Sequence, residues 1–327
     1  MPIATEPVYG SVSVGGDTHR IVLGGETPDG STSPNGLTYD IDRFNTSAEL
    51  EVDIHTDTPP SEGQSVTCSL QGETFFTGTV TTSEKRAGFV HLIANDIVHT
   101  LKRATLTQSF TEADIATIAE AALEQASVNA RTTAAIDLPA ETTSAEFSEE
   151  RCDKILEDVS DWGNAVWGVD ANNSVYLTQA IDERTTRHEL EHVVDAAPGE
   201  RTMPYQSVRV EGASPASRKG QQSMHLVASE SVRATAGDGE PQFTHQDSRI
   251  KTKAMAENAA EAILTELKRQ RGTGTITVAG DPSIRPYDTV SPLDTIDTGE
   301  YLVSGIQHRI TSQDGFRTTI KCGGVVS

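Results

Sequence analysis

Residues 299–324 read GEYLVSGIQHRITSQDGFRTTIKCGG and carry a strand pattern on both sides of a polar turn. The run YLVSGIQHRI alternates apolar with polar residues, and FRTTIKCGG does the same after TSQDG. Alternation with a period of two places successive side chains on opposite faces of a strand. The stretch therefore predicts two β-strands and indicates a chain in which strands dominate.

The same alternation fills the sequence between residues 9 and 100. Short apolar-polar runs are separated there by Gly, Pro, Asn and Asp, which are typical of turns. The runs are SVSVGG, RIVLGG, LTYDID, AELEVDIH, SVTCSL, TFFTGTVTT and AGFVHLIAND. About seven short strands in a segment of this length predict a sandwich or a barrel.

The period changes to that of a helix in the middle of the chain. A first helix is predicted from Thr111, with apolar residues on one face, and a second from about Ser148. The next segment predicts a strand, a turn and a strand over residues 165–179. Two helices followed by this hairpin predict a small α/β unit, with Trp162 and Trp167 packing the hairpin onto the helices.

Strand patterns return after Tyr205 in SVRVEGA, MHLVASES and GTITVAG. One segment among them, residues 253–271, is rich in Ala, Glu, Leu and Lys and predicts a long helix that ends at Gly272. The whole chain is thus predicted to be mainly β with an α+β insertion.

The charge balance argues against polyanionic partners. The 327 residues include 26 Lys and Arg against 48 Asp and Glu, a formal net charge of −22. Such a surface repels nucleic acid and anionic lipid, so we expect no sequence-specific nucleic-acid binding. Only eight of the cations are Lys, and this Arg-rich, acidic pattern is typical of salt-loving archaea, although an ordinary acidic soluble protein remains an alternative.

Other sequence features limit the remaining classes. Three cysteines, Cys68, Cys152 and Cys322, are odd in number and lack C-x-x-C spacing, so they favour neither a disulfide framework nor a thiolate metal site. No signal peptide and no run of 18 apolar residues is found, so we expect no membrane anchor. Aromatic residues make up 5%, which argues against a carbohydrate-binding β-domain with exposed aromatic platforms.

One short motif suggests an enzyme. Residues 188–192 read HELEH, which matches the zinc-peptidase string H-E-x-x-H. On a helix, His188 and His192 would face one metal ion and Glu189 would polarise the bound water. A zinc-dependent metallopeptidase that uses these three residues is therefore an alternative function.

The surroundings of the motif favour coincidence. β-branched residues flank HELEH and Pro198 follows closely, which is unfavourable for a helix. On a strand, His188 and His192 would share a face but lie about 13 Å apart, too far for one ion. A convincing third ligand is also missing. We therefore predict no catalytic, cofactor-binding or metal-binding residue and no cofactor, and we expect the protein not to be an enzyme.

Three segments together resemble phage baseplate hub proteins of the late control protein D type. Residues 155–179, ILEDVSDWGNAVWGVDANNSVYLTQ, resemble the family's helix, Gly, aromatic strand, turn and Tyr-containing strand. Residues 274–293, GTITVAGDPSIRPYDTVSPL, resemble its Gly- and Pro-containing barrel segment, although Tyr287 stands where the family often has Gly. Residues 299–324 are similar to its closing hairpin, and PYQSVRVEGAS, residues 204–214, fits the first strand of its second barrel.

The resemblance implies two tube-protein-like β-barrels that flank a small α/β domain. Three regions follow: an N-terminal β-barrel at residues 1–103, an insertion at 104–197, and a second β-barrel with one long helix at 198–327. HELEH would then lie where the chain leaves the insertion, in a connecting strand.

The resemblance also implies an architectural function. Three copies of such a hub make a pseudo-sixfold ring that joins a hexameric tail tube to a trimeric spike or tail-tip protein, and a tape measure protein is a further possible partner. The expected protein is a tail or baseplate hub in the virion of a tailed virus that infects a salt-loving archaeon, assembled in the host cytoplasm. The hub of a contractile injection particle would use nearly the same part.

Overall fold

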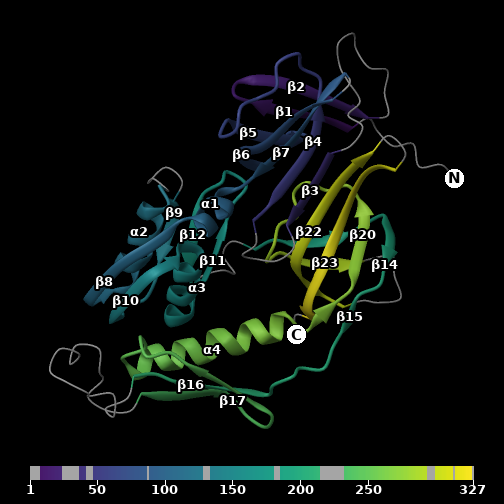
Figure 1. The fold of residues 1–327 in the computed structure, drawn as a ribbon. Helices are drawn as coiled ribbons and strands as arrows, with labels where there is room; N and C mark the ends of the chain where they lie inside the picture. Colours follow the sequence, from purple (N-terminus) through teal and green to yellow (C-terminus); the bar gives the residue numbers. More distant parts are fainter. Residues whose placement is uncertain are drawn as a thin grey trace.

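The computed structural model describes residues 8–23, 37–41, 47–86, 88–127, 133–179, 185–213, 232–292, 299–311 and 314–325. Strands dominate the described chain; three of its four helices gather on one side, and the fourth, residues 253–269, runs along the bottom of the view (Figure 1). The predicted fold class, mainly β with an α+β insertion, is confirmed. The predicted strand MHLVASES lies outside the described residues, as does part of RIVLGG.

The N-terminal strands form an antiparallel sheet. Leu37, Tyr39 and Ile41 on β3 are buried while the residues between them are half-exposed, which is the alternation that the sequence predicts. The strands are β1 (Val8–Val14), β2 (Asp17–Leu23), β3 (Leu37–Ile41), β4 (Glu49–Ile54), β5 (Ser65–Leu70), β6 (Glu73–Arg86) and β7 (Phe89–Asn95).

The C-terminal strands continue this sheet. They are β13 (Arg187–Leu190), β14 (Val193–Ala196), β20 (Thr275–Ala279), β21 (Thr289–Pro292), β22 (Tyr301–Thr311) and β23 (Gly315–Val325). The hairpin β22–β23 forms as the alternation in residues 299–324 predicts, and its first strand pairs antiparallel with β3. The strand order is β14-β20-β23-β22-β3-β4-β7-β6-β5-β1-β2, with β21 branching to β22 and β13.

The two predicted barrels are therefore joined. Ile306 and Ile310 on β22 lie opposite Ile41 and Leu37 on β3, and all four side chains are buried. One hydrophobic core contains residues from both ends of the chain. Within the described residues the strands form one continuous 13-stranded sheet and no closed barrel, because the β3–β22 ladder links the two sets of strands.

The middle of the chain forms a second core around three helices. The elements are α1 (Ile97–Arg103), β8 (Thr105–Asp114), α2 (Ile115–Gln125), β9 (Thr133–Asp137), β10 (Thr142–Arg151), α3 (Cys152–Gly163), β11 (Val166–Val169) and β12 (Val175–Thr178). The predicted helices exist, but α2 begins at Ile115 rather than at Thr111. Residues 105–114 pair with β10 as a strand, and the Asp114 carboxylate caps the helix by accepting from the Ala116 N–H.

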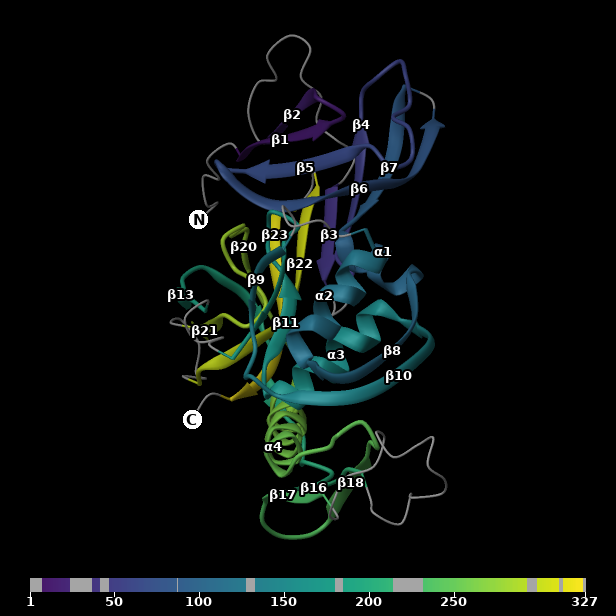
Figure 2. The same cartoon turned by 90° about the vertical axis from the view of Figure 1, so that its left-hand side faces the viewer.

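The remaining elements pack onto this second core. They are β15 (Gly199–Glu200), β16 (Ser207–Glu211), β17 (Arg233–Gly237), β18 (Gln242–Gln246), α4 (Lys253–Arg269) and β19 (Gly272–Thr273). Strand β16 pairs with β17 and β18 in a separate sheet, and α4 lies across that sheet (Figure 2). Val208, Val210 and Leu264 share the core of α2 and α3.

This packing differs from what the resemblance implies for PYQSVRVEGAS. Strand β16 lies in the small sheet rather than with the strands of the C-terminal hairpin. The Trp162 indole N–H donates to the Asp247 carboxylate at 3.0 Å, and Arg249 stacks over the Trp162 ring. These contacts hold the end of β18 against α3. The boundaries at residues 103 and 197 stay a prediction.

Candidate functional site

The HELEH residues do not form a helix. Residues 187–190 form β13, which pairs in parallel with β21, and residues 193–196 form β14, which pairs with β20. His192 lies in the bend between these strands with φ 58°. Glu189 and His192 are exposed, while His188 is half-buried. His188 and Glu189 lie on β13 while His192 lies in the bend after it, so the two histidines do not sit one helical turn apart and the metallopeptidase alternative is not supported.

His188 instead contacts a buried carboxylate. Its Nε2 lies 3.0 Å from Oδ2 of Asp288, whose side chain is 3% exposed. The backbone N–H groups of Thr186 and Arg285 donate to the same carboxylate at 2.8 Å and 2.7 Å. The hydrogen bond to Asp288 raises the pKa of His188, against the opposing effect of burial. The contact fastens β13 to the turn before β21, and the histidine has a structural role.

Among the described residues, no group of three or more His, Cys, Asp or Glu side chains has the geometry of a metal site. Cys68, Cys152 and Cys322 are buried, and none of them forms a disulfide bond within the described residues. Burial raises the pKa of the Cys152 thiol to about 11, so this cysteine is a packing residue at neutral pH and not a thiolate nucleophile.

A fully buried histidine lies in the sheet core. His308 on β22 is fully buried, and its Nδ1 lies 2.9 Å from the Thr318 hydroxyl on β23. The ring stacks on Tyr39 of β3 and meets Phe75 and Phe316 edge on. Burial lowers its pKa to about 3, so the ring is neutral at physiological pH. His308 is thus an aromatic core residue that joins strands from both ends of the chain.

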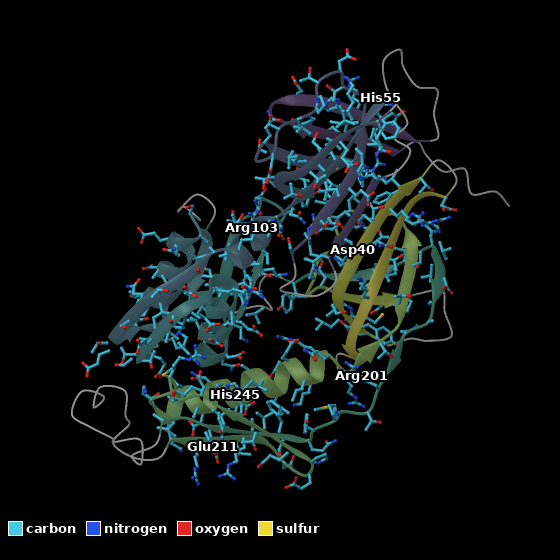
Figure 3. The ribbon with its side chains drawn as sticks, in the orientation of Figure 1. Asp40, His55, Arg103, Arg201, Glu211 and His245 are labelled. Carbon is cyan, nitrogen blue, oxygen red and sulfur yellow. The ribbon has the colours of Figure 1, made fainter. Side chains whose placement is uncertain are left out.

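Polar contacts support the same junction from the opposite face. Asp40 on β3 accepts from the Gln307 side-chain amide at 2.8 Å and from Lys321 Nζ at 3.2 Å (Figure 3). The three residues come from β3, β22 and β23. The junction between the N-terminal and C-terminal strands therefore has apolar contacts on one face and charged contacts on the other.

Tyr287 occupies an unusual backbone position. Its φ is 74°, in the left-handed region that favours Gly, yet its side chain is 4% exposed. The ring packs with Tyr176 on β12, and the Arg269 guanidinium from α4 lies 5.3 Å from its centroid. Tyr287 therefore joins the C-terminal sheet to the insertion, and its ring gains contacts that offset an unfavourable φ.

The surface itself offers two apolar positions at the ends of the large sheet. Among described residues, the exposed large hydrophobic side chains are Tyr9, 60% exposed, and Val194, 53% exposed. Tyr9 lies on β1, beside the edge strand β2, whereas Val194 lies on β14, the edge strand at the opposite end of the strand order. Neither residue stands out in the sequence, because exposure at a sheet edge depends on strand order.

No helix within the described ranges is both long and apolar enough to cross a membrane. No protein-family model matches the chain, and no curated protein sequence matches it.

Solved structures do match, over nearly the whole chain. A tail protein from Neisseria meningitidis MC58 is similar with a TM-score of 0.70 and 12% identity, covering 97% of each chain. The 43 kDa tail protein of prophage MuSo2 from Shewanella oneidensis gives 0.66 and 12%, covering 96% of this chain and 98% of that one. An Escherichia coli component of the type VI secretion system gives 0.60 and 9%, covering 97% and 77%. At these identities the similarity establishes the fold.

Proposed function

We propose that the protein is a structural component of a phage-type tail, where it acts as the hub between tube and spike. Three copies form a pseudo-sixfold ring that joins the hexameric tail tube to a trimeric spike or tail-tip protein, with a tape measure protein as a further partner. The ring belongs to the baseplate of a virion that assembles in the host cytoplasm, and the host is a salt-loving archaeon. The protein carries out no reaction.

The observation that carries this proposal is the full-length match to tail proteins. The similarity to the Neisseria meningitidis tail protein covers 97% of both chains, so it includes both sets of strands and the insertion between them. Fold similarity alone does not fix a function. The proposal is supported further by exposed apolar side chains near both ends of the large sheet.

The two exposed apolar side chains suit a ring. A ring needs a head-to-tail contact, in which one patch of each copy meets a different patch of the next copy. Tyr9 and Val194 lie near opposite ends of the strand order in the large sheet. Each copy therefore has one exposed apolar side chain near each end of that sheet. Strand β14 also has no described partner on the side away from β20, which leaves backbone groups for pairing with a neighbouring copy.

The mass of the particle in solution tests the ring. We expect sedimentation velocity in concentrated KCl to show a trimer, because apolar burial persists when charges are screened. Replacing Val194 with Ser should weaken each subunit contact by about 1–2 kcal/mol and shift the equilibrium toward monomer. Thr244→Ser, on an exposed position of the small sheet, is the matched control and should leave the trimer intact. A wild-type monomer at every concentration and salt condition would contradict the proposal.

A contractile injection particle is a second candidate context. It is favoured by the type VI secretion component, which has the same fold over 97% of this chain. The two contexts require the same ring and differ in the larger assembly around it.

A further inference from the structure

The small sheet β17-β16-β18 has one covered face and one polar face. Strand alternation turns Val208 and Val210 of β16 toward the core that they share with α4. Arg209 and Glu211 alternate with them and therefore lie on the opposite face, where Figure 3 shows Glu211 pointing away from α4. No described element packs on this polar face.

Strand β17 forms a free edge of the same sheet. It pairs with β16 on one side, and no other described strand lies beside it (Figure 2). The Gly212 N–H donates to the Val232 carbonyl, and antiparallel ladders alternate between bonded and non-bonded pairs. The register then directs the backbone N–H groups of Arg233 and Thr235 away from β16. These donors are available to an added strand.

A basic groove follows this edge. It has a volume of about 490 Å³ and is lined by Arg209, Arg233, Ala234, Thr235, Gln242, Lys253 and Glu257. Arg209 contacts Glu211 at 2.8 Å and Lys253 contacts Glu257 at 3.0 Å, while Arg233 lies 4.0 Å from Glu211 and is 61% exposed. On the polar face the two guanidinium groups of Arg209 and Arg233 share the one carboxylate of Glu211, which leaves a local positive excess in a chain whose net charge is −22.

We propose that the edge of β17 binds an extended acidic segment of a partner protein, which adds a fourth strand to the small sheet. Backbone pairing to Arg233 and Thr235 would supply affinity, and carboxylates on alternate residues of the segment would face Arg209 and Arg233 on the polar face. A nucleic acid fits less well, because it cannot complete a β-ladder and because the rest of this acidic surface repels a long polyanion. The inference does not depend on the trimeric ring.

A peptide titration tests the proposal. The probe is a fluorescein-labelled decapeptide of alternating Glu and Thr, compared with the Lys-Thr decapeptide and with a single-stranded oligothymidylate. We expect only the Glu-Thr peptide to bind in fluorescence anisotropy, and binding should weaken as salt is raised. The double variant Arg209→Glu, Arg233→Glu should weaken binding of the Glu-Thr peptide tenfold or more, because two attractive charge contacts become repulsive.

Arg86→Glu is the matched control, because Arg86 pairs with Glu84 two residues away on strand β6 as Arg209 pairs with Glu211 on β16. It should leave binding unchanged. Hydrogen exchange supplies a second readout: the peptide should slow exchange at Arg233 and Thr235 in the wild-type protein. Absence of binding, an equal loss with Arg86→Glu, tighter binding of the oligothymidylate, or binding without protection of β17 would each overturn the proposal.

Discussion

At the scale of single residues, the Asp288 carboxylate organises the turn before β21. It is 3% exposed and accepts from two backbone N–H groups as well as from His188. A buried carboxylate has given up its hydration, and each hydrogen-bond donor that it loses leaves more of that free-energy cost uncompensated. His188 therefore contributes to stability through Asp288.

His188→Ala should lower the free energy of unfolding by about 1–3 kcal/mol at pH 6, because the buried carboxylate loses a charged donor. The folded-state pKa of His188 is raised, so its contribution is fully present below the unfolded value and is lost as pH rises through the folded value. The difference from wild type should thus shrink at high pH. Urea unfolding at acidic and alkaline pH measures it.

His192→Asn is the control for this measurement, because Asn tolerates the left-handed backbone at that exposed bend. We expect it to stay within about 0.5 kcal/mol of wild type. Equal losses of unfolding free energy in His188→Ala and His192→Asn would contradict the structural role of His188. Stoichiometric zinc in the wild-type protein that is lost in His188→Ala would contradict it as well.

Tyr287 permits a test of backbone strain against packing. Tyr287→Ala should cost about 3–5 kcal/mol, because a buried aromatic ring is removed. Tyr287→Gly removes the same ring but relieves the positive φ, so this variant should be as stable as Tyr287→Ala or more stable by up to about 1 kcal/mol. Thermal unfolding of the pair measures the difference. A Gly variant clearly less stable than the Ala variant would show that φ is not strained at this position.

The HELEH motif shows that a short sequence motif does not by itself determine the secondary structure or the partners of its residues. β-branched neighbours correctly predicted that His188 and His192 do not share a helix. The sequence did not predict that the chain bends between them, nor that Asp288 is the partner of His188, because the partner lies 100 residues away. Long-range pairing of this kind depends on strand order and leaves no local pattern.

At the scale of elements, the β3–β22 ladder decides how the molecule is organised. It joins strands that the sequence assigns to two barrels, and it gives both ends of the chain one hydrophobic core. The alternation of apolar and polar residues predicted the strands of the closing hairpin and β3, because burial of one strand face can be read from neighbouring residues in the sequence. It could not predict their pairing, because a strand pattern does not specify its neighbour.

A cavity in the β3–β22 ladder should therefore destabilise both the N-terminal and the C-terminal strands. Ile306 on β22 is 1% exposed and lies opposite Ile41 and Ile320. Ile306→Ala should cost about 2–5 kcal/mol of unfolding free energy. Hydrogen exchange should accelerate in β4 and β7 as well as in β20 and β23, because these strands unfold together with the ladder. Acceleration confined to β20 and β23 would show that the two sets of strands are independent.

The small sheet was the least predictable element. SVRVEGA was correctly predicted as a strand, but it pairs with β17 and β18, and α4 covers it. The resemblance implied a barrel strand at this place. The apolar residues Val208 and Val210 fit either environment equally well, so only the three-dimensional structure distinguishes them.

At the scale of the whole molecule, the chain combines a large open sheet, whose strand order runs from β14 to β2, with a helical insertion on one side (Figure 1). The fold class was predictable because composition and periodicity change along the chain in the same order as the architecture. The proposed structural role was not predictable from any single residue cluster. A structural component works through repeated surfaces, and such surfaces have no short sequence motif.

Electron microscopy of the purified protein in concentrated KCl tests the central claim most directly. We predict closed particles of three copies in which the N-terminal and C-terminal strands of each copy occupy six similar positions around one axis. A reconstruction with unrelated positions for the two sets of strands, or particles that remain single copies at high protein concentration, would contradict the assignment as a tail hub.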